Sequence, residues 1–236
     1  MKITYIYHSS FLAETAECYY LFDYYKGPLP SMDPAKPILV LASHSHQDHY
    51  TPAVFDQLRQ LGMQNITAVL SNDISRKLYP ESCPAVRVIH SQEYSLPCHT
   101  HLQTLLSTDS GVAFLLSCPE GVLYHGGDLN DWNMEDTPDQ ERRQMTGSYR
   151  ASIRKLKGIS IDAACLPLDP RLGDFYACGF LYFLKNVTVK KVYPMHYWEQ
   201  PEIIDRFMSE YPEYSGLIVH PASVEPEKNQ NGGCRS

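Results

Sequence analysis

Short apolar runs separated by turn residues dominate the first half of the chain. Runs at 2–7, 18–22 and 38–42 are predicted as strands, and the last of them has no polar position. Such an uninterrupted run is typical of a buried strand. Further strands are expected at 67–70, 86–90, 101–106, 112–117 and 122–125, with the last two joined as a hairpin.

Helical patterns begin after residue 50. Thr51-Pro52 predicts a helix start, with threonine as cap and proline at the first helical position, and the helix is expected to end near Gly62. A capping box at 137–140 predicts a polar helix to about Lys157. The remaining elements are expected as strands at 162–166, 191–194 and 217–219 and helices at 175–184 and 201–211.

Strands first, then strands alternating with helices, favour stacked sheets covered by helices, an α+β architecture. The 236 residues, 43% of them hydrophobic, are enough for a stable core, and no linker or internal repeat divides them. A single domain is therefore expected over 1–222. The polar residues 223–236 are expected to form a flexible C-terminal tail.

Charge and cysteine content exclude some functional classes. The net charge of -7 gives no electrostatic footprint for a polyanion, so no nucleic-acid partner is expected. The seven cysteines contain no C-x-x-C pair and the chain opens without an apolar signal segment, which favours free thiols in a cytoplasmic setting. No apolar run reaches transmembrane length, so no membrane association is expected. The oligomeric state stays open.

The strongest chemical signal is the run HSHQDH at 44–49, directly after the buried strand. It places three imidazoles and a carboxylate within six residues, the ligands that borderline divalent metals such as zinc prefer. The alternative is a polar loop whose histidines satisfy backbone groups. The spacing H-x-H-x-D-H is rare enough by chance to favour the metal interpretation.

Two later segments end predicted strands with further candidate ligands. In the run YHGGD at 124–128, two glycines let the backbone turn closely, so that Asp128 projects at the strand end. The run YPMH at 193–196 likewise ends with His196. Alone, Asp128 would be interpreted as a turn aspartate, but beside the first motif a ligand role is favoured for both residues.

With these motifs the chain resembles the metallo-β-lactamase-fold hydrolase superfamily up to about residue 222. The resemblance rests on HSHQDH at 44–49, LYHGGDLN at 123–130 and YPMHYWE at 193–199, with weaker echoes in HSSFL at 8–12 and YLFD at 20–23. Within the superfamily the chain is most similar to the branch of ascorbate-6-phosphate lactonase and other small hydrolases. The resemblance implies a four-layer αββα sandwich of two mixed sheets, with the metal site at one edge between them.

The resemblance also implies a site for one or two divalent ions. Its ligands would be His44 and His46 in a first metal site, Asp48, His49 and His196 in a second, and Asp128 as the bridge between them.

The superfamily's third histidine of the first site is missing from the stretch 107–112. Asp109 is the nearest replacement, and the alternatives are Ser107 or Thr108, His99, His101 or water. Exchanging imidazole for carboxylate shifts preference towards manganese or iron, although zinc remains the first choice. We therefore expect a mixed His/Asp binuclear site, or one well-occupied metal beside a weak one.

Several neighbouring polar residues are candidates for supporting roles. Asp23, which ends a strand, is expected near the metal loop, where its carboxylate would hold the second ring nitrogen of a metal-bound histidine; a turn role is the alternative. His8 is equally open. His125 could donate to a substrate oxygen or satisfy a buried carbonyl.

Three further residues are expected around the substrate. Arg171 could clamp a phosphate or carboxylate, or form a structural pair with Asp169. Trp132 and Trp198 closely follow ligand motifs and are expected to wall the pocket.

The chemistry that these residues favour is hydrolysis of a small-molecule ester, lactone, amide or phosphodiester by a metal-activated water. Asp48 or Asp128 would orient the nucleophile or shuttle its proton. One alternative is an RNA or DNA nuclease of the same superfamily, which the acidic charge disfavours. The other is a non-catalytic metal- or ligand-binding protein with a degraded first site.

Overall fold

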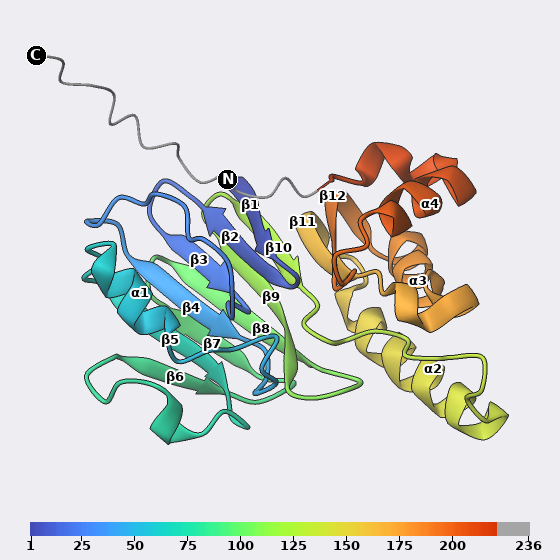
Figure 1. Ribbon diagram of the computed structural model, residues 1–236, viewed down its shortest axis with the longest axis horizontal. Helices are drawn as coiled ribbons and strands as arrows, with labels where there is room; N and C mark the ends of the chain where they lie inside the picture. The colour runs from blue at the N-terminus through green and yellow to red at the C-terminus, as the bar shows by residue number, and fades with distance from the viewer. Residues whose placement is uncertain (221–236) are drawn as a thin grey trace, which may run out of the picture.

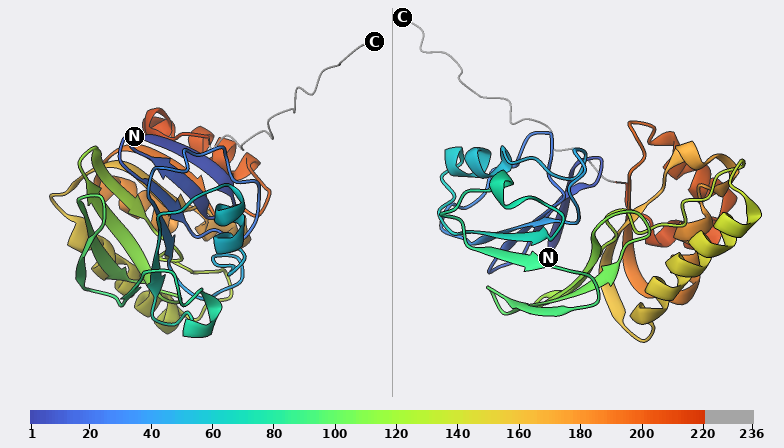
Figure 2. Two further views of the ribbon diagram at one scale, coloured as in Figure 1. Left: turned by 90° about the vertical axis from the view of Figure 1, so that its left-hand side faces the viewer. Right: turned by 90° about the horizontal axis from the view of Figure 1, so that it is seen from below.

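The computed structural model describes residues 1–220, so the tail expected at 223–236 lies outside the described residues. The described chain forms two six-stranded sheets, each with both parallel and antiparallel pairs, that pack face to face with helices on their outer sides (Figure 1). Figure 2 shows the four layers from a second direction. The predicted αββα sandwich is confirmed.

The first sheet contains the N-terminal strands in chain order. These are β1 (Lys2–Tyr7), β2 (Ser10–Glu14), β3 (Tyr19–Phe22), β4 (Ile38–Ala42), β5 (Ile66–Ser71) and β6 (Ala85–Val88). Helix α1 (Val54–Gln60) covers its outer face. Successive side chains of a strand point to opposite faces. Leu39 and Leu41 therefore join the core between the sheets, while Ile38 and Val40 pack towards α1, and the whole of β4 is buried.

The second sheet is covered by the three C-terminal helices. Its strands, in spatial order, are β12 (Thr188–Met195), β11 (Ser160–Pro167), β10 (Gly121–His125), β9 (Val112–Cys118), β8 (Thr100–Leu106) and β7 (Glu93–Leu96). The helices are α2 (Asp139–Ile153), α3 (Cys178–Asn186) and α4 (Glu202–Glu210). Four short 3-10 turns complete the described chain: η1 (Arg76–Leu78), η2 (Arg154–Leu156), η3 (Pro170–Phe175) and η4 (Pro212–Leu217).

The structure corrects the sequence prediction at four elements. The sequence prediction missed β2 and β7, short strands between turns. The strand expected at 217–219 is wrong: η4 ends at Leu217, and Ile218 makes only a single bridge to Val192. Helix α1 begins at Val54 with no side-chain cap, so the predicted Thr51 cap is wrong as well.

Strand direction decides where the site forms. In the first sheet β1, β3 and β4 run parallel, because β2 is antiparallel to both β1 and β3 and β3 is parallel to β4. In the second sheet β10, β11 and β12 run parallel. The loops after these strands meet at one edge of the sandwich, the place where open α/β sheets commonly bind ligands.

Two further observations concern the described residues. None of their helices combines the length and the apolar character needed to cross a membrane. Their six cysteines are all free thiols.

Candidate metal centre

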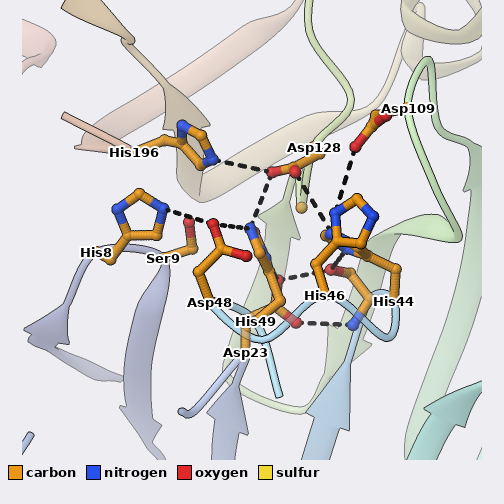
Figure 3. A network of polar contacts seen from close by, with 12 residues as sticks. His8, Ser9, Asp23, His44, His46, Asp48, His49, Asp109, Asp128 and His196 are labelled. Atoms are coloured by element: carbon orange, nitrogen blue, oxygen red, sulfur yellow. Dashed lines mark hydrogen bonds and ion pairs between the residues drawn. The ribbon is translucent and has the colours of Figure 1, made fainter. Parts of the chain in front are cut away.

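Six side chains of the centre each follow the end of a parallel strand. They are His8 after β1, Asp23 after β3, His44 after β4, Asp128 after β10, Asp169 after β11 and His196 after β12. Figure 3 shows how most of them converge with the HSHQDH loop. The hydrogen-bonded strands fix the loop starts, so residues far apart in sequence reach one place.

The converging residues form two clusters whose ligand atoms lie within 4.8 Å of one another in each. The first consists of His44, His46, Asp109 and Asp128, and the second of His8, Asp48, His49 and His196. Asp128 faces both clusters. Its Oδ2 lies 3.4 Å from Nε2 of His44, and its Oδ1 lies 3.1 Å from Nε2 of His49 and 3.5 Å from Nε2 of His196.

The donor atoms themselves indicate a missing cation. Among residues 1–220, Nε2 of His8, His44 and His49 and Oδ1 of Asp128 are buried and form no hydrogen bond. A buried polar atom left in this state costs about 1–3 kcal/mol. Imidazole nitrogens aimed at a shared carboxylate suit a divalent ion of the zinc, manganese or iron type. The residues present therefore fit such a metal.

Buried partners hold the rings of the HSHQDH loop in one orientation. Asp23 Oδ2 accepts a hydrogen bond from Nδ1 of His49 at 2.8 Å. Ser43 Oγ donates to Asp23 Oδ2 at 2.6 Å and so accepts from Nδ1 of His44 at 2.9 Å. With the Nδ1 proton engaged, each ring presents its Nε2 lone pair to the cluster.

His196 is held in the same way from the second sheet. Asp169 Oδ2 accepts from Nδ1 of His196 at 2.9 Å. Asp169 also binds the Arg171 guanidinium, with Nε 3.0 Å from both of its oxygens, and accepts from Trp198 Nε1 at 3.3 Å. Burial acts to raise the pKa of Asp169, but His196 and Arg171 outweigh it and lower the pKa to about 2.

Mutual attraction between carboxylates and imidazoles dominates the electrostatics of the cluster. Burial would raise the pKa of Asp128, but the neighbouring His49, His44 and His196 hold it well below its ordinary value. Burial would likewise lower the pKa of His49, yet the charges of Asp128 and Asp23 hold it well above. Two buried aspartates are thus kept ionised, as a cation site requires.

The backbone is unusual where it delivers these side chains. His8, Asp23 and His196 adopt positive φ angles of 53°, 43° and 63°. Non-glycine residues seldom do so, and when they do they are often found at functional sites. A close approach between the sheets depends on Gly111, where φ is +64° and an added Cβ would lie 1.9 Å from the Ser43 carbonyl oxygen.

Asp109 takes the place of the absent third histidine of the first site. It lies in the β8–β9 turn, with Oδ2 3.6 Å from His46 Nδ1. Its competitors are engaged elsewhere: His99 pairs with Glu17 and His101 with Glu93 on the exposed β7–β8 hairpin.

The two hydroxyls that were also considered are occupied as well. Ser107 Oγ accepts from the Asp109 amide at 3.2 Å, and Thr108 Oγ1 donates to the Asn130 carbonyl at 2.6 Å. Among the four protein residues that the sequence left as alternatives to Asp109, none joins the cluster.

His8 is the residue whose position sequence reasoning underestimated. It was expected beside the site, but its Nε2 lies 3.5 Å from Asp48 Oδ2 within the second cluster. Burial is the largest cause that lowers the pKa of His8, which leaves the ring neutral and its lone pair available. The only signal for it was its place directly after the first strand.

The catalytic role considered for His125 is not supported by its position. Its Nε2 donates to the Ser9 carbonyl at 2.9 Å, and its Nδ1 accepts from the Gly127 amide at 3.2 Å. The ring stacks on Phe22 with centroids 5.0 Å apart and is buried. Both nitrogens are occupied, so His125 satisfies a buried carbonyl, the second of the two roles weighed for it.

A cavity of about 380 Å³ opens over the two clusters. His46, Asp48, Asp109, Asp128 and His196 contribute to it, and so do Thr108, Trp132, Met134, Met145, Arg171 and Trp198. Trp132 is anchored by a hydrogen bond from Nε1 to the Asp128 carbonyl at 2.8 Å. Both tryptophans wall the cavity, so the centre is accessible to a small ligand.

Comparison with known proteins decides the family. The profile of the beta-lactamase superfamily domain matches residues 2–143. The chain belongs to this superfamily. Its narrower placement near the ascorbate-6-phosphate lactonase branch stays a prediction.

Relatives of this superfamily member include two proteins named UPF0173 metal-dependent hydrolase. The one from Desulforamulus reducens is 28% identical over 214 residues, covering 86% of this chain and 87% of the relative. The one from Opitutus terrae is 26% identical over 216 residues, with coverage of 86% and 87%.

Solved structures share the fold. Igni18, a metallo hydrolase from Ignicoccus hospitalis, has a TM-score of 0.64 at 17% identity, with 94% of this chain and 95% of that chain covered. CmlA, a diiron β-hydroxylase from Streptomyces venezuelae, has a TM-score of 0.55 at 14% identity and covers 93% of this chain and 52% of its own. The fold therefore accommodates different chemistries, and function must be argued from the site.

Proposed function

We propose that this metal-dependent hydrolase binds two divalent ions and cleaves a small ester, lactone, amide or phosphodiester. The observation that carries the proposal is the position of Asp128 between two ligand clusters, 3.4 Å from His44 on one side and 3.1 Å from His49 on the other. A carboxylate placed in this way is suited to bridge two ions.

The ligand sets follow from the clusters. The first ion would be held by His44, His46, Asp109 and the bridge, and the second by His8, Asp48, His49, His196 and the bridge. A divalent ion in such a site lowers the pKa of water towards neutrality and polarises the oxygen of the bond to be cleaved. The equal share of carboxylates in the first set favours manganese or iron there relative to an all-histidine site, whereas the histidine-rich second set suits zinc.

The chain's own groups would position the reactants. Asp48 lines the cavity and its side chain is 29% exposed, so it can hold a proton of the attacking water. Trp132 and Trp198 shield the reacting atoms from bulk solvent. The size of the cavity fits a small molecule, and we propose no nucleic-acid substrate.

Turnover by metal-loaded protein tests the proposal. We would assay 4-nitrophenyl acetate, homoserine lactone, bis(4-nitrophenyl) phosphate and single-stranded RNA at low salt, together with metal content by mass spectrometry. Hydrolysis of a small substrate is expected and should be lost in Asp128→Asn but kept in Asp56→Asn, a surface change on α1.

The same experiment separates the alternatives. RNA cleavage without small-molecule turnover would favour the nuclease. Two bound ions without turnover on any of the four substrates would favour the non-catalytic binding protein.

A further inference from the structure

We infer that Arg171, stacked on Trp198 at the mouth of the cavity, selects substrates that carry one carboxylate or phosphate group on an apolar body. This inference deepens the proposed function and rests on it for the catalytic step. Its argument starts from how Arg171 is held.

Arg171 is fixed on one side and free on the other. Its Nε and Nη2 bind the buried Asp169, with Nη2 2.5 Å from Oδ2, and its guanidinium carbon lies 4.4 Å from the Trp198 ring centroid. Within residues 1–220, Nη1 makes no hydrogen bond, and the side chain remains 52% exposed. A guanidinium held in this way loses little conformational freedom when it binds a second oxyanion.

The charge pattern of the cavity makes Arg171 the anion site. Among the described residues that line the cavity, it is the single arginine or lysine. The other charged residues there are Asp48, Asp109 and Asp128, which metal ions would neutralise. The remaining wall, formed by Met134, Met145 and the two tryptophans, is apolar apart from the indole nitrogens, and so fits the hydrophobic part of a small acid.

The surface beyond Arg171 limits the ligand to one anionic group. A second hollow of about 640 Å³ adjoins the cavity and shares Met134 and Arg171 with it. Glu135, Asp136 and Asp174 line this hollow, and their carboxylates would repel further negative charge. The arrangement therefore suits a small acid and opposes a polyanion such as nucleic acid.

Binding of inert probes to metal-loaded protein tests the inference independently of turnover. Phenylacetate and phenylphosphonate supply the two oxyanions, and phenylacetamide is the neutral match. We expect Arg171→Gln to weaken the two acids about ten- to hundredfold, the range for losing a charged hydrogen bond. The amide should change less than twofold, and Arg59→Ala on α1 should leave all three affinities unchanged. Comparison of the two acids decides between carboxylate and phosphate.

A second variant and a metal measurement separate binding from positioning. Arg171→Lys keeps the charge and should retain most of the acid affinity. If Arg171→Gln weakened the amide as much as the acids, or removed metal from the protein, Arg171 would act only by positioning Asp169 and the inference would be overturned. Unchanged acid affinity in Arg171→Gln would also overturn it, because the metals alone would then bind the acid.

Turnover provides the last comparison. Mono-4-nitrophenyl glutarate should be preferred over 4-nitrophenyl valerate, and Arg171→Gln should remove that preference through KM with kcat retained. Probe binding without turnover on either ester would contradict the proposed hydrolysis and leave the ligand class standing. Turnover with no preference for the acid would contradict the ligand class alone.

Discussion

The carboxylate of Asp23 accepts a hydrogen bond from His49 Nδ1 at 2.8 Å, and both side chains are completely buried. The same relationship recurs between Asp169 and His196, at 2.9 Å, on the other sheet. Two histidines of the proposed second site are therefore each backed by an aspartate at the end of a neighbouring strand. Carboxylate support of this kind fixes the ring and raises the basicity of the ligating nitrogen.

Replacing Asp23 by asparagine should weaken the second metal site. The amide nitrogen of asparagine cannot accept the His49 proton as both carboxylate oxygens can, so the ring would lose its fixed orientation. We expect a loss in metal affinity of about 10- to 100-fold. Competition with a chromogenic chelator measures it, with Asp56→Asn on the surface of α1 as the matched control. Equal affinities in the two variants would contradict the role assigned to Asp23.

Removing the His8 imidazole tests whether it is a ligand. His8→Ala should reduce the bound metal towards one equivalent at limiting metal concentration, because the second cluster loses one of its three imidazoles. His99→Ala, on an exposed histidine paired with Glu17, is the control. Two full equivalents in His8→Ala would show that His8 only packs beside the site.

Asp109 should determine the metal preference of the first site. In Asp109→Ala the first ion should bind more weakly, and in Asp109→His the preference should move from manganese or iron towards zinc, because imidazole is the softer ligand. Metal content after growth in mixed-metal medium measures both effects. An unchanged metal ratio in Asp109→His would mean that Asp109 does not contribute to the site.

Metal removal should destabilise the fold. An ion that binds only the folded state at a hundredfold excess over its Kd stabilises it by about 2.7 kcal/mol. For a chain of this size each kcal/mol moves Tm by about 2–4 °C, so chelation should lower Tm by several degrees. Differential scanning calorimetry with and without chelator checks this, and re-addition of metal should restore Tm.

Gly111 should tolerate no side chain. Gly111→Ala would place a Cβ 1.9 Å from the Ser43 carbonyl at a φ of +64°, and we expect a loss of about 2–4 kcal/mol of stability. Gly147→Ala, in α2 with no heavy atom within 4 Å of the added carbon, should instead stabilise by about 0.5–1 kcal/mol. Urea titration of both variants decides whether the close approach of the sheets depends on Gly111.

The sequence predicted the fold because its apolar runs and motifs are local signals. The all-apolar β4 and the loop after it could be located from spacing alone. The place of His8 could not, since it depends on β1 lying parallel to β3, a pairing that no local pattern specifies. The two roles weighed for His125 could likewise be separated only by the Ser9 carbonyl, which lies more than a hundred positions earlier in the chain.

The distribution of ligands over both sheets has a consequence for protein synthesis. A ribosome makes the HSHQDH loop early, when half of the proposed coordination sphere does not yet exist. His196 is added only after most of the chain has been made. An ion captured by the nascent chain would be bound by an incomplete set of ligands, so selection of the correct metal must occur after translation has nearly finished.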